Sequence, residues 1–237
     1  MISAIDHEDH LALRNRIDAL EARVRNAALA ADRDPATVTI TAVSKTFSRE
    51  LVDQVYAIGL SNFGESRVQE AREKFAGELP ADLRLTMIGH LQTNKVRQAL
   101  QVFDRIESVD RPSLIETLER EAARIDTRCS VLLQVNIGRE PQKSGCLPED
   151  AATLARAVEE SPHLRLDGLM GIAPLVATLE EARPFFRSLS ELRDRLREGV
   201  VASDLGVLSM GMSGDFEAAI AEGATHVRIG SAIFGGR

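Results

Sequence analysis

The feature that most constrains the fold is a repeated alternation of strand-like and helix-like segments. Short segments rich in β-branched and apolar residues are separated by amphipathic stretches such as SRELVDQVYAIG and EARPFFRSLSELRDRLREG. This alternation predicts parallel strands joined by right-handed helical crossovers, and eight units match the number at which a sheet closes into a (β/α)8 TIM barrel. An open doubly wound sheet is the structural alternative. The predicted strands cover residues 37–44, 61–64, 83–89, 102–109, 130–137, 164–170, 206–210 and 225–230.

One domain is expected to cover residues 1–237, because this length suits a single α/β barrel and no Ser/Gly-rich linker interrupts the sequence. Apolar residues recur at helical spacing over residues 8–31. This pattern predicts an amphipathic leading helix, within residues 1–34, that packs on the barrel. The cluster GREPQKSGCLPED predicts one longer loop after the fifth strand.

Local signals mark the ends of two predicted helices. Ser48 is expected to cap a helix that begins at Arg49, and Gly59 is expected to end it. Asp110 and Pro112 are expected to serve as the cap and an early proline of another helix.

Composition narrows the possible partners and location. The net charge of −7 repels nucleic-acid backbones, and a chain with no Trp and one Tyr offers no stacking platform for bases. No apolar run approaches the roughly 20 residues of a membrane span, and the first residues do not resemble a secretory signal. We therefore expect a cytoplasmic protein with no nucleic-acid or membrane partner. Cys129 and Cys146 lack the spacing of a disulfide framework or a zinc site and are interpreted as free thiols.

Lys45 is the first candidate functional residue. It stands at the end of the first predicted strand, in TAVSKTF, where barrel enzymes carry their reactive groups. An amine at that position can attack a carbonyl and form an imine. The alternative is a lysine that flanks a strand and extends its amine to water.

Two Gly- and Ser-containing turns near the C-terminus are candidates for phosphate binding. LSMGMSGDFEAAI is a strand, a turn and a helix that begins near Gly214 or Asp215, although Ser213 as an ordinary helix cap explains the same pattern. The next strand ends at Gly230 and Ser231, before a short terminal helix. Barrels often bind phosphate between the loops after strands seven and eight.

Arg228 shares the facing of Gly230, so it is predicted to reach either a phosphate or a ring nitrogen, with a structural ion pair as the alternative. Together with an imine-forming lysine on strand one, the two turns describe how a barrel holds pyridoxal phosphate. They also fit a phosphosugar aldolase.

Seven stretches in order resemble the pyridoxal phosphate homeostasis proteins, a family similar to the N-terminal domain of alanine racemase. They cover nearly the whole chain and read AVSKT, FGESRVQEA, IGHLQTNK, QVNIGREPQKSG, GLMGIAP, LSMGMSGDFEAAI and VRIGSAIFG. The resemblance implies a single barrel with pyridoxal 5′-phosphate as cofactor, bound as a Schiff base on Lys45. The cofactor-binding residues that it implies are Lys45, Ser66, Met212, Ser213, Gly214, Arg228, Gly230 and Ser231.

Two of these positions depart from the family pattern. Many relatives carry Asn in place of Ser66, so the shorter serine puts one contact near the cofactor ring in doubt. Ser231 replaces a frequent threonine and keeps the hydroxyl, so the phosphate contact is expected to survive.

The resemblance implies a carrier or buffer in vitamin B6 and amino-acid homeostasis, without robust catalysis. Apo forms of pyridoxal-phosphate enzymes are conceivable recipients, and a monomer or weak dimer is expected. A weak amino-acid racemase is the alternative, but related racemases use a second domain and a tyrosine base, and the sole tyrosine, Tyr56, lies in a predicted helix. His90 is the best remaining acid–base candidate, yet a structural histidine is favoured there. No catalytic role is assigned to His90 or to Glu65, Asp204 or Asp215, which are acids near the predicted barrel mouth.

Overall fold

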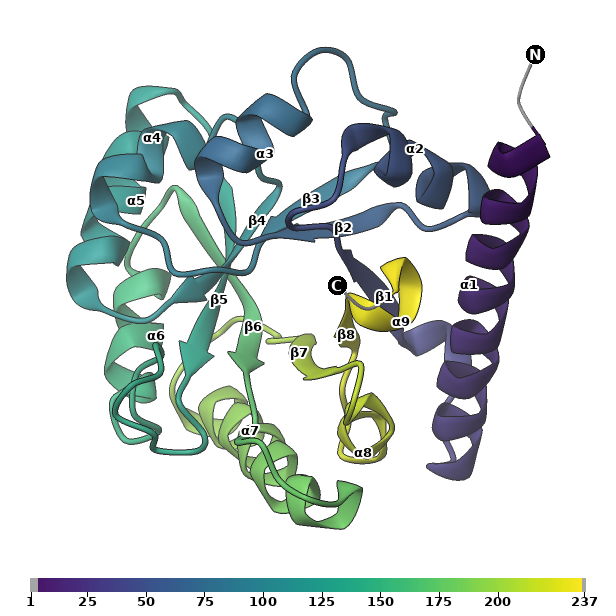
Figure 1. The fold of residues 1–237 in the computed structure, drawn as a ribbon. Coiled ribbons are helices and arrows are strands. Elements are labelled where there is room, and N and C mark those ends of the chain that lie inside the picture. Colours follow the sequence, from purple (N-terminus) through teal and green to yellow (C-terminus); the bar gives the residue numbers. More distant parts are fainter. Residues whose placement is uncertain (1–3, 236–237) are drawn as a thin grey trace.

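The structure, a computed structural model, describes residues 4–235, with side chains from His10 onward. Its strands are all parallel and close into one barrel in chain order, β1 to β8 (Figure 1). The predicted (β/α)8 TIM barrel is therefore confirmed, and the open sheet is excluded. The strands are β1 (Thr39–Val43), β2 (Asn62–Glu65), β3 (Arg84–Met87), β4 (Arg105–Val109), β5 (Cys129–Val135), β6 (Leu164–Gly171), β7 (Val207–Met212) and β8 (His226–Ile229).

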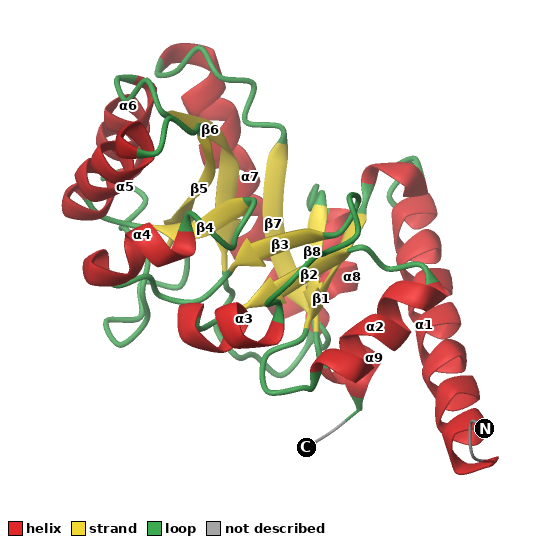
Figure 2. Ribbon diagram, turned by 90° about the horizontal axis from the view of Figure 1, so that it is seen from above, coloured by secondary structure: helices red, strands yellow, loops and turns green. Residues whose placement is uncertain are grey.

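Helices lie around the outside of the strands, as the view turned by 90° shows (Figure 2). The α-helices are α1 (Ala4–Ala30), α2 (Arg49–Ile58), α3 (Val68–Lys74), α4 (Val96–Ala99), α5 (Pro112–Arg124), α6 (Ala151–Glu159), α7 (Leu179–Gly199), α8 (Phe216–Ala221) and α9 (Ser231–Phe234). Two 3-10 turns, η1 (Pro35–Thr37) and η2 (Thr93–Lys95), complete the described elements. The long loop predicted after the fifth strand lies between β5 and α6.

The helix signals were only partly correct. Ser48 caps α2 by accepting a hydrogen bond from the Leu51 N–H, and Gly59 ends that helix with a φ of 129°. Pro112 is the first residue of α5, but the predicted cap Asp110 is wrong, because Arg111 occupies the cap position. The Asp110 carboxylate instead binds Arg111 and accepts the Gly145 N–H, so tertiary contacts take it away from the helix end.

Strand one begins later than predicted. The predicted segment started at residue 37, but residues 35–37 form η1. Asp34 caps this turn by accepting a hydrogen bond from the Ala36 N–H, and Pro35 fixes the backbone at its start. The β-branched run after it then enters the barrel as β1.

The leading helix α1 packs along the outside of the barrel, as predicted, beside α8 and α9 (Figure 1). Its buried side chains recur every three or four residues, so one face of the helix is apolar. Arg16 Nε donates to the Ile233 carbonyl oxygen at 2.8 Å, and Arg33 Nη1 donates to the Ile220 carbonyl oxygen at 2.8 Å. Helix α1 therefore holds the two helices that follow β7 and β8. The buried residues are Leu13, Ile17, Leu20, Val24 and Ala28.

Both cysteines are buried and unpaired, which confirms the interpretation as free thiols. Burial raises the pKa of each thiol, Cys129 and Cys146, to about 12, so both stay protonated at neutral pH. Among residues 4–235, no helix has the length and apolar character needed to cross a membrane. Nor does this part of the chain gather three or more His, Cys, Asp or Glu side chains that could hold a metal ion.

We predict that Ile17→Ala lowers the free energy of unfolding by about 2–5 kcal/mol, because it leaves a cavity between α1 and the barrel. Leu11→Ala is the control, since Leu11 lies on the same helix and is 57% exposed. It is expected to change stability by less than about 0.5 kcal/mol. Urea denaturation measures both, and equal effects would contradict the packing described for α1.

Candidate functional site

A cavity of about 390 Å³ opens at the carboxyl ends of the barrel strands and gathers all eight predicted site residues. We call it the Lys45 cavity. Its walls come from the ends of β1, β2, β3, β6, β7 and β8, where TIM barrels carry their active sites. The lining residues are Val43, Lys45, Ser66, Ile88, Gly89, Ile172, Met212, Ser213, Gly214, Arg228, Gly230 and Ser231.

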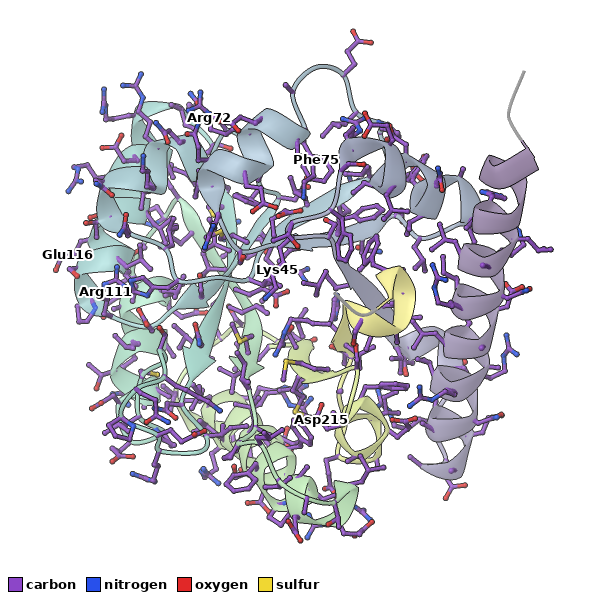
Figure 3. The ribbon with its side chains drawn as sticks, in the orientation of Figure 1. Lys45, Arg72, Phe75, Arg111, Glu116 and Asp215 are labelled. Carbon is purple, nitrogen blue, oxygen red and sulfur yellow. The ribbon has the colours of Figure 1, made fainter. Side chains whose placement is uncertain are left out.

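Lys45 enters the cavity from the end of β1. This strand pairs with β2 on one side and with β8 on the other, so every second side chain of β1 points into the barrel. Because side chains alternate along a strand, Lys45 continues the inward facing of Val43, and both line the cavity. Figure 3 shows Lys45 near the centre of the ring of strands. Within the described part of the chain, its amine forms no hydrogen bond or ion pair, so it is available to a ligand.

The loop after β7 is held in a fixed shape. The Met212 N–H donates to Asp215 Oδ1 at 2.6 Å, and the Asp215 N–H donates to the Met212 carbonyl oxygen at 3.1 Å. Between these two residues, the Ser213 hydroxyl and the Gly214 N–H have no partner among the described residues. Two donors are thus presented at the cavity. The predicted alternative, Ser213 as the helix cap, is wrong, because Asp215 occupies the cap position of α8.

Gly211 allows this loop to approach α8. Its φ is 91°, and a Cβ atom there would lie 2.6 Å from the Ala219 side chain and 2.9 Å from the Phe216 Cα. A larger residue would therefore clash with α8 and strain the backbone. Close packing of α8 on the end of β7 thus requires glycine at this position.

The opposite wall follows β8. Gly230 and Ser231 line the cavity, and α9 begins at Ser231. The Ser231 hydroxyl has no hydrogen-bond partner elsewhere in residues 4–235. The loops after β7 and β8 therefore present free hydroxyl and N–H donors to the same space, as the expected phosphate site requires.

Arg228 is almost fully buried, with 4% of its surface exposed, and it lines the same cavity. Nη1 donates to the Ser209 carbonyl oxygen at 2.6 Å and to Ser209 Oγ at 2.8 Å, while Nη2 donates to the Gly171 carbonyl oxygen at 2.8 Å. Ser209 Oγ donates in turn to Glu107 Oε2 at 2.6 Å. Burial raises the pKa of the Glu107 carboxyl, and the charge of Arg228 opposes that shift. Arg228 is therefore a rigid cation whose orientation depends on β6 and β7.

Two further cavities adjoin the Lys45 cavity. One of about 440 Å³ includes Arg67, His90 and Lys95 and shares Ser66 and Gly89 with it. Another of about 270 Å³ includes His90 and Lys143. None of the described residues that line these three cavities is an Asp or a Glu. In a chain with net charge −7, the barrel mouth is thus a locally cationic region that favours anionic ligands.

Close contact between two loops sets the boundary of the Lys45 cavity. A Cβ atom at Gly89 would lie 2.3 Å from the Ser66 carbonyl oxygen, so only glycine lets the loop after β3 rest on the loop after β2. This contact places Ser66 and Gly89 in the wall shared by two cavities.

The other candidates lie outside the Lys45 cavity. Tyr56 donates its hydroxyl proton to Asp82 Oδ1 at 2.5 Å, and neither residue lines the cavity. His90 is exposed and lines only the two adjoining cavities. Asp204 pairs with Arg197, and Asp215 braces the loop after β7 without lining the cavity.

Sequence patterns did not reveal the residues that orient the site residues without lining the Lys45 cavity. Glu107 and Ser209 orient Arg228, and Lys74 reaches the turn that carries Lys45. Alternation along the segment RIESV could have placed Glu107 inside the barrel. Nothing in the sequence indicated that Lys74 belongs near Lys45.

The sequence model of the family described as "Alanine racemase, N-terminal domain" matches residues 16–237. The chain is 44% identical to the "Pyridoxal phosphate homeostasis protein" of Pseudomonas aeruginosa, over 95% of this chain and 96% of that protein. It is 41% identical to the protein of the same name in Aquifex aeolicus, over 94% and 97% of the two chains. The solved structure of PipY from Synechococcus elongatus PCC7942 with PLP bound superimposes with a TM-score of 0.83 at 35% identity, covering 94% of this chain and all of that one.

The buried His226 gives a prediction for pH dependence. Burial lowers the pKa of His226 from 6.5 to about 4, and the charges of Arg105 and Arg228 add to this shift. Between these two values the unfolded chain binds more protons than the folded one, so the protein loses stability as the pH falls through that range. We expect the stability advantage of wild type over His226→Gln to shrink by up to about 3 kcal/mol between pH 7 and pH 4. Urea denaturation across that range measures it, and pH profiles that run parallel would contradict the assignment.

Proposed function

The chain belongs to the pyridoxal phosphate homeostasis protein family, and on this premise we propose that it binds pyridoxal 5′-phosphate as a Schiff base on Lys45. The single observation that carries the proposal is that one cavity gathers an amine without a partner, a buried guanidinium and two loops with free donors. Its volume of about 390 Å³ falls within the range of small-molecule sites.

The residues of the Lys45 cavity fit the chemical groups of this cofactor. An aldehyde requires an amine, which Lys45 supplies. A phosphate requires several donors, and the loops with Ser213, Gly214, Gly230 and Ser231 supply them, while no Asp or Glu among the described residues lines the cavity. Arg228 remains to contact the ring or the phosphate. Ser66 lies in the wall formed by the loop after β2.

When bound, pyridoxal phosphate supplies an aldehyde for imine exchange and an electron sink for carbanions. Carbanion chemistry at an amino acid also needs groups that move protons at the α-carbon. Among the described residues that line the Lys45 cavity, there is no His, Tyr, Asp or Glu. Lys45 is thus the sole candidate base there, which supports a carrier or buffer of the cofactor over a racemase with two bases.

The cationic mouth supports the same role. Arg67 and Lys95 lie in a cavity that adjoins the Lys45 cavity, so an anionic cofactor is attracted to this end of the barrel. We propose that the protein takes up pyridoxal phosphate here and releases it to other proteins of B6 metabolism.

Trapping of the cofactor tests the site. Purified protein mixed with pyridoxal phosphate is expected to absorb visible light, and borohydride is expected to fix one label on Lys45, identified by peptide mass spectrometry. Lys45→Ala should abolish the chromophore and the label. Lys143→Ala, which removes a lysine whose charge is paired with Glu140, should retain both. A label on another lysine in the wild-type protein would refute the assignment, and the absence of any label would refute the Schiff base.

Exchange of the α-hydrogen of amino acids for deuterium separates the carrier from the weak racemase. With the cofactor bound, we expect no sustained exchange in D2O, because the described lining of the cavity offers no second base. NMR of L- and D-alanine measures it. Sustained turnover that Lys45→Ala abolishes would establish the racemase instead.

A further inference from the structure

A buried ionic cluster lies behind the turn that carries Lys45. Glu65 at the end of β2 is completely buried, and it accepts hydrogen bonds from Lys74 Nζ at 2.8 Å and from Ser44 Oγ at 2.7 Å. Lys74, on α3, is only 7% exposed and also donates to the Ser44 carbonyl oxygen at 2.7 Å. Glu70, one helical turn earlier, pairs with Lys74 at 3.2 Å and accepts the Thr46 N–H. The cluster thus contacts both neighbours of Lys45 in the sequence.

These contacts hold a tight turn. The Phe47 N–H donates to the Ser44 carbonyl oxygen at 3.1 Å, so residues 44–47 form a closed four-residue turn with Lys45 in its second position. Thr46, in the third position, has a φ of 70°. That left-handed conformation favours glycine and is strained for a β-branched residue, so it persists only where surrounding contacts impose it. The hydrogen bond from Thr46 to Glu70 is one such contact.

Removal of these charges from water is costly unless their partners are well placed. Burial raises the pKa of the Glu65 carboxyl, and Lys74 and Ser44 oppose that shift. One carboxylate oxygen, Oε2, has no partner among the described residues. No residue of the cluster lines the Lys45 cavity, so ligand binding does not explain their presence.

From this arrangement we infer that Lys74, Glu65 and Glu70 are positioning residues that hold the turn 44–47 so that the Lys45 amine faces the cofactor. The inference rests on the proposed function of Lys45. The cluster supports the turn from the outer side of β1 and β2, whereas the cofactor occupies the inner side. Lys74 acts by binding the carbonyl of Ser44, and Glu70 acts by holding Thr46 in its strained conformation.

The double variant Lys74→Met with Glu65→Gln separates positioning from simple stability. It removes both buried charges together, so neither is left unpaired, while the hold of Lys74 on the Ser44 carbonyl is lost. The matched control is Arg183→Met with Glu222→Gln. These residues form an ion pair at 2.8 Å with side chains 34% and 9% exposed, and they contact no residue of the turn.

Two readouts follow the double variant, one of which needs no cofactor. Hydrogen exchange of the amides of residues 44–47 in cofactor-free protein is expected to become about tenfold faster. The affinity for pyridoxal phosphate, followed by the visible absorbance and by borohydride labelling of Lys45, is expected to fall about tenfold. The control pair should change neither. Wild-type exchange and affinity in the double variant would overturn the inference.

A second set of variants applies even if the double variant does not fold. Glu70→Ala removes the contact to Thr46 and is expected to weaken cofactor binding, whereas Thr46→Gly accepts a φ of 70° without strain. If Glu70 acts through the conformation of Thr46, the loss caused by Glu70→Ala is smaller in the Thr46→Gly background. Equal losses in the two backgrounds would overturn this part of the inference. If wild-type protein fails to label at Lys45, the proposed function fails; if it labels and these variants match it, the positioning role fails.

Discussion

Closure of the sheet between β1 and β8 is the constraint on which the rest of the structure depends. The two strands pair in parallel from Thr39 with His226 to Ala42 with Ile229, which joins the beginning of the barrel to its end. This pairing places Lys45 beside Arg228, Gly230 and Ser231 in one cavity, although they lie far apart in the sequence. Helix α1 secures the same seam from outside, because it packs on α8 and α9 and donates hydrogen bonds to the carbonyl groups of Ile220 and Ile233. The Lys45 amine and the free donors of the loops after β7 and β8 therefore meet in one cavity only when the barrel is closed.

Buried charge on both sides of the barrel wall gives the cavity its rigidity. Inside, Glu107 and Ser209 fix Arg228, whose guanidinium is also held by the Gly171 carbonyl. On the outer side of the barrel, Lys74 donates a hydrogen bond to the Ser44 carbonyl oxygen, in the turn that carries Lys45, and pairs with Glu65. Such pairs contribute little net stability, because desolvation offsets most of their attraction, but they restrict the directions in which their neighbours can lie. A site that is formed before its ligand arrives loses little free energy to ordering on binding.

Much of the fold and part of the cavity lining could be predicted from local patterns, whereas Ser66 and Met212 were implied only by the resemblance to a known family. The strands were found because β-branched and apolar runs recur between amphipathic segments, and Ser48 and Gly59 marked the ends of α2 because capping is a local interaction. Asp110 was misassigned because its carboxylate binds Gly145 in a loop that comes much later in the sequence. The alternative interpretation of Ser213 as a helix cap fails because α8 begins later, with Asp215 at the cap position. For Asp110, a side chain suited to a local role is used in a contact with a distant loop that sequence spacing does not reveal.

By itself the sequence determined the barrel fold, the approximate positions of its strands and the residues that follow the strand ends. It could do so because periodicity and turn composition are properties of neighbouring residues. It also placed Lys45, Arg228 and the two Gly- and Ser-containing turns at strand ends, where a barrel carries its chemistry. Only the tertiary structure decided that Lys74 lies against the Ser44 carbonyl and that Thr46 is held in a left-handed conformation. It also decided that the Lys45 cavity adjoins a second cavity lined by Arg67 and Lys95. These features arise from side chains on different elements that come together when the barrel closes, and no local pattern in the sequence encodes their distances.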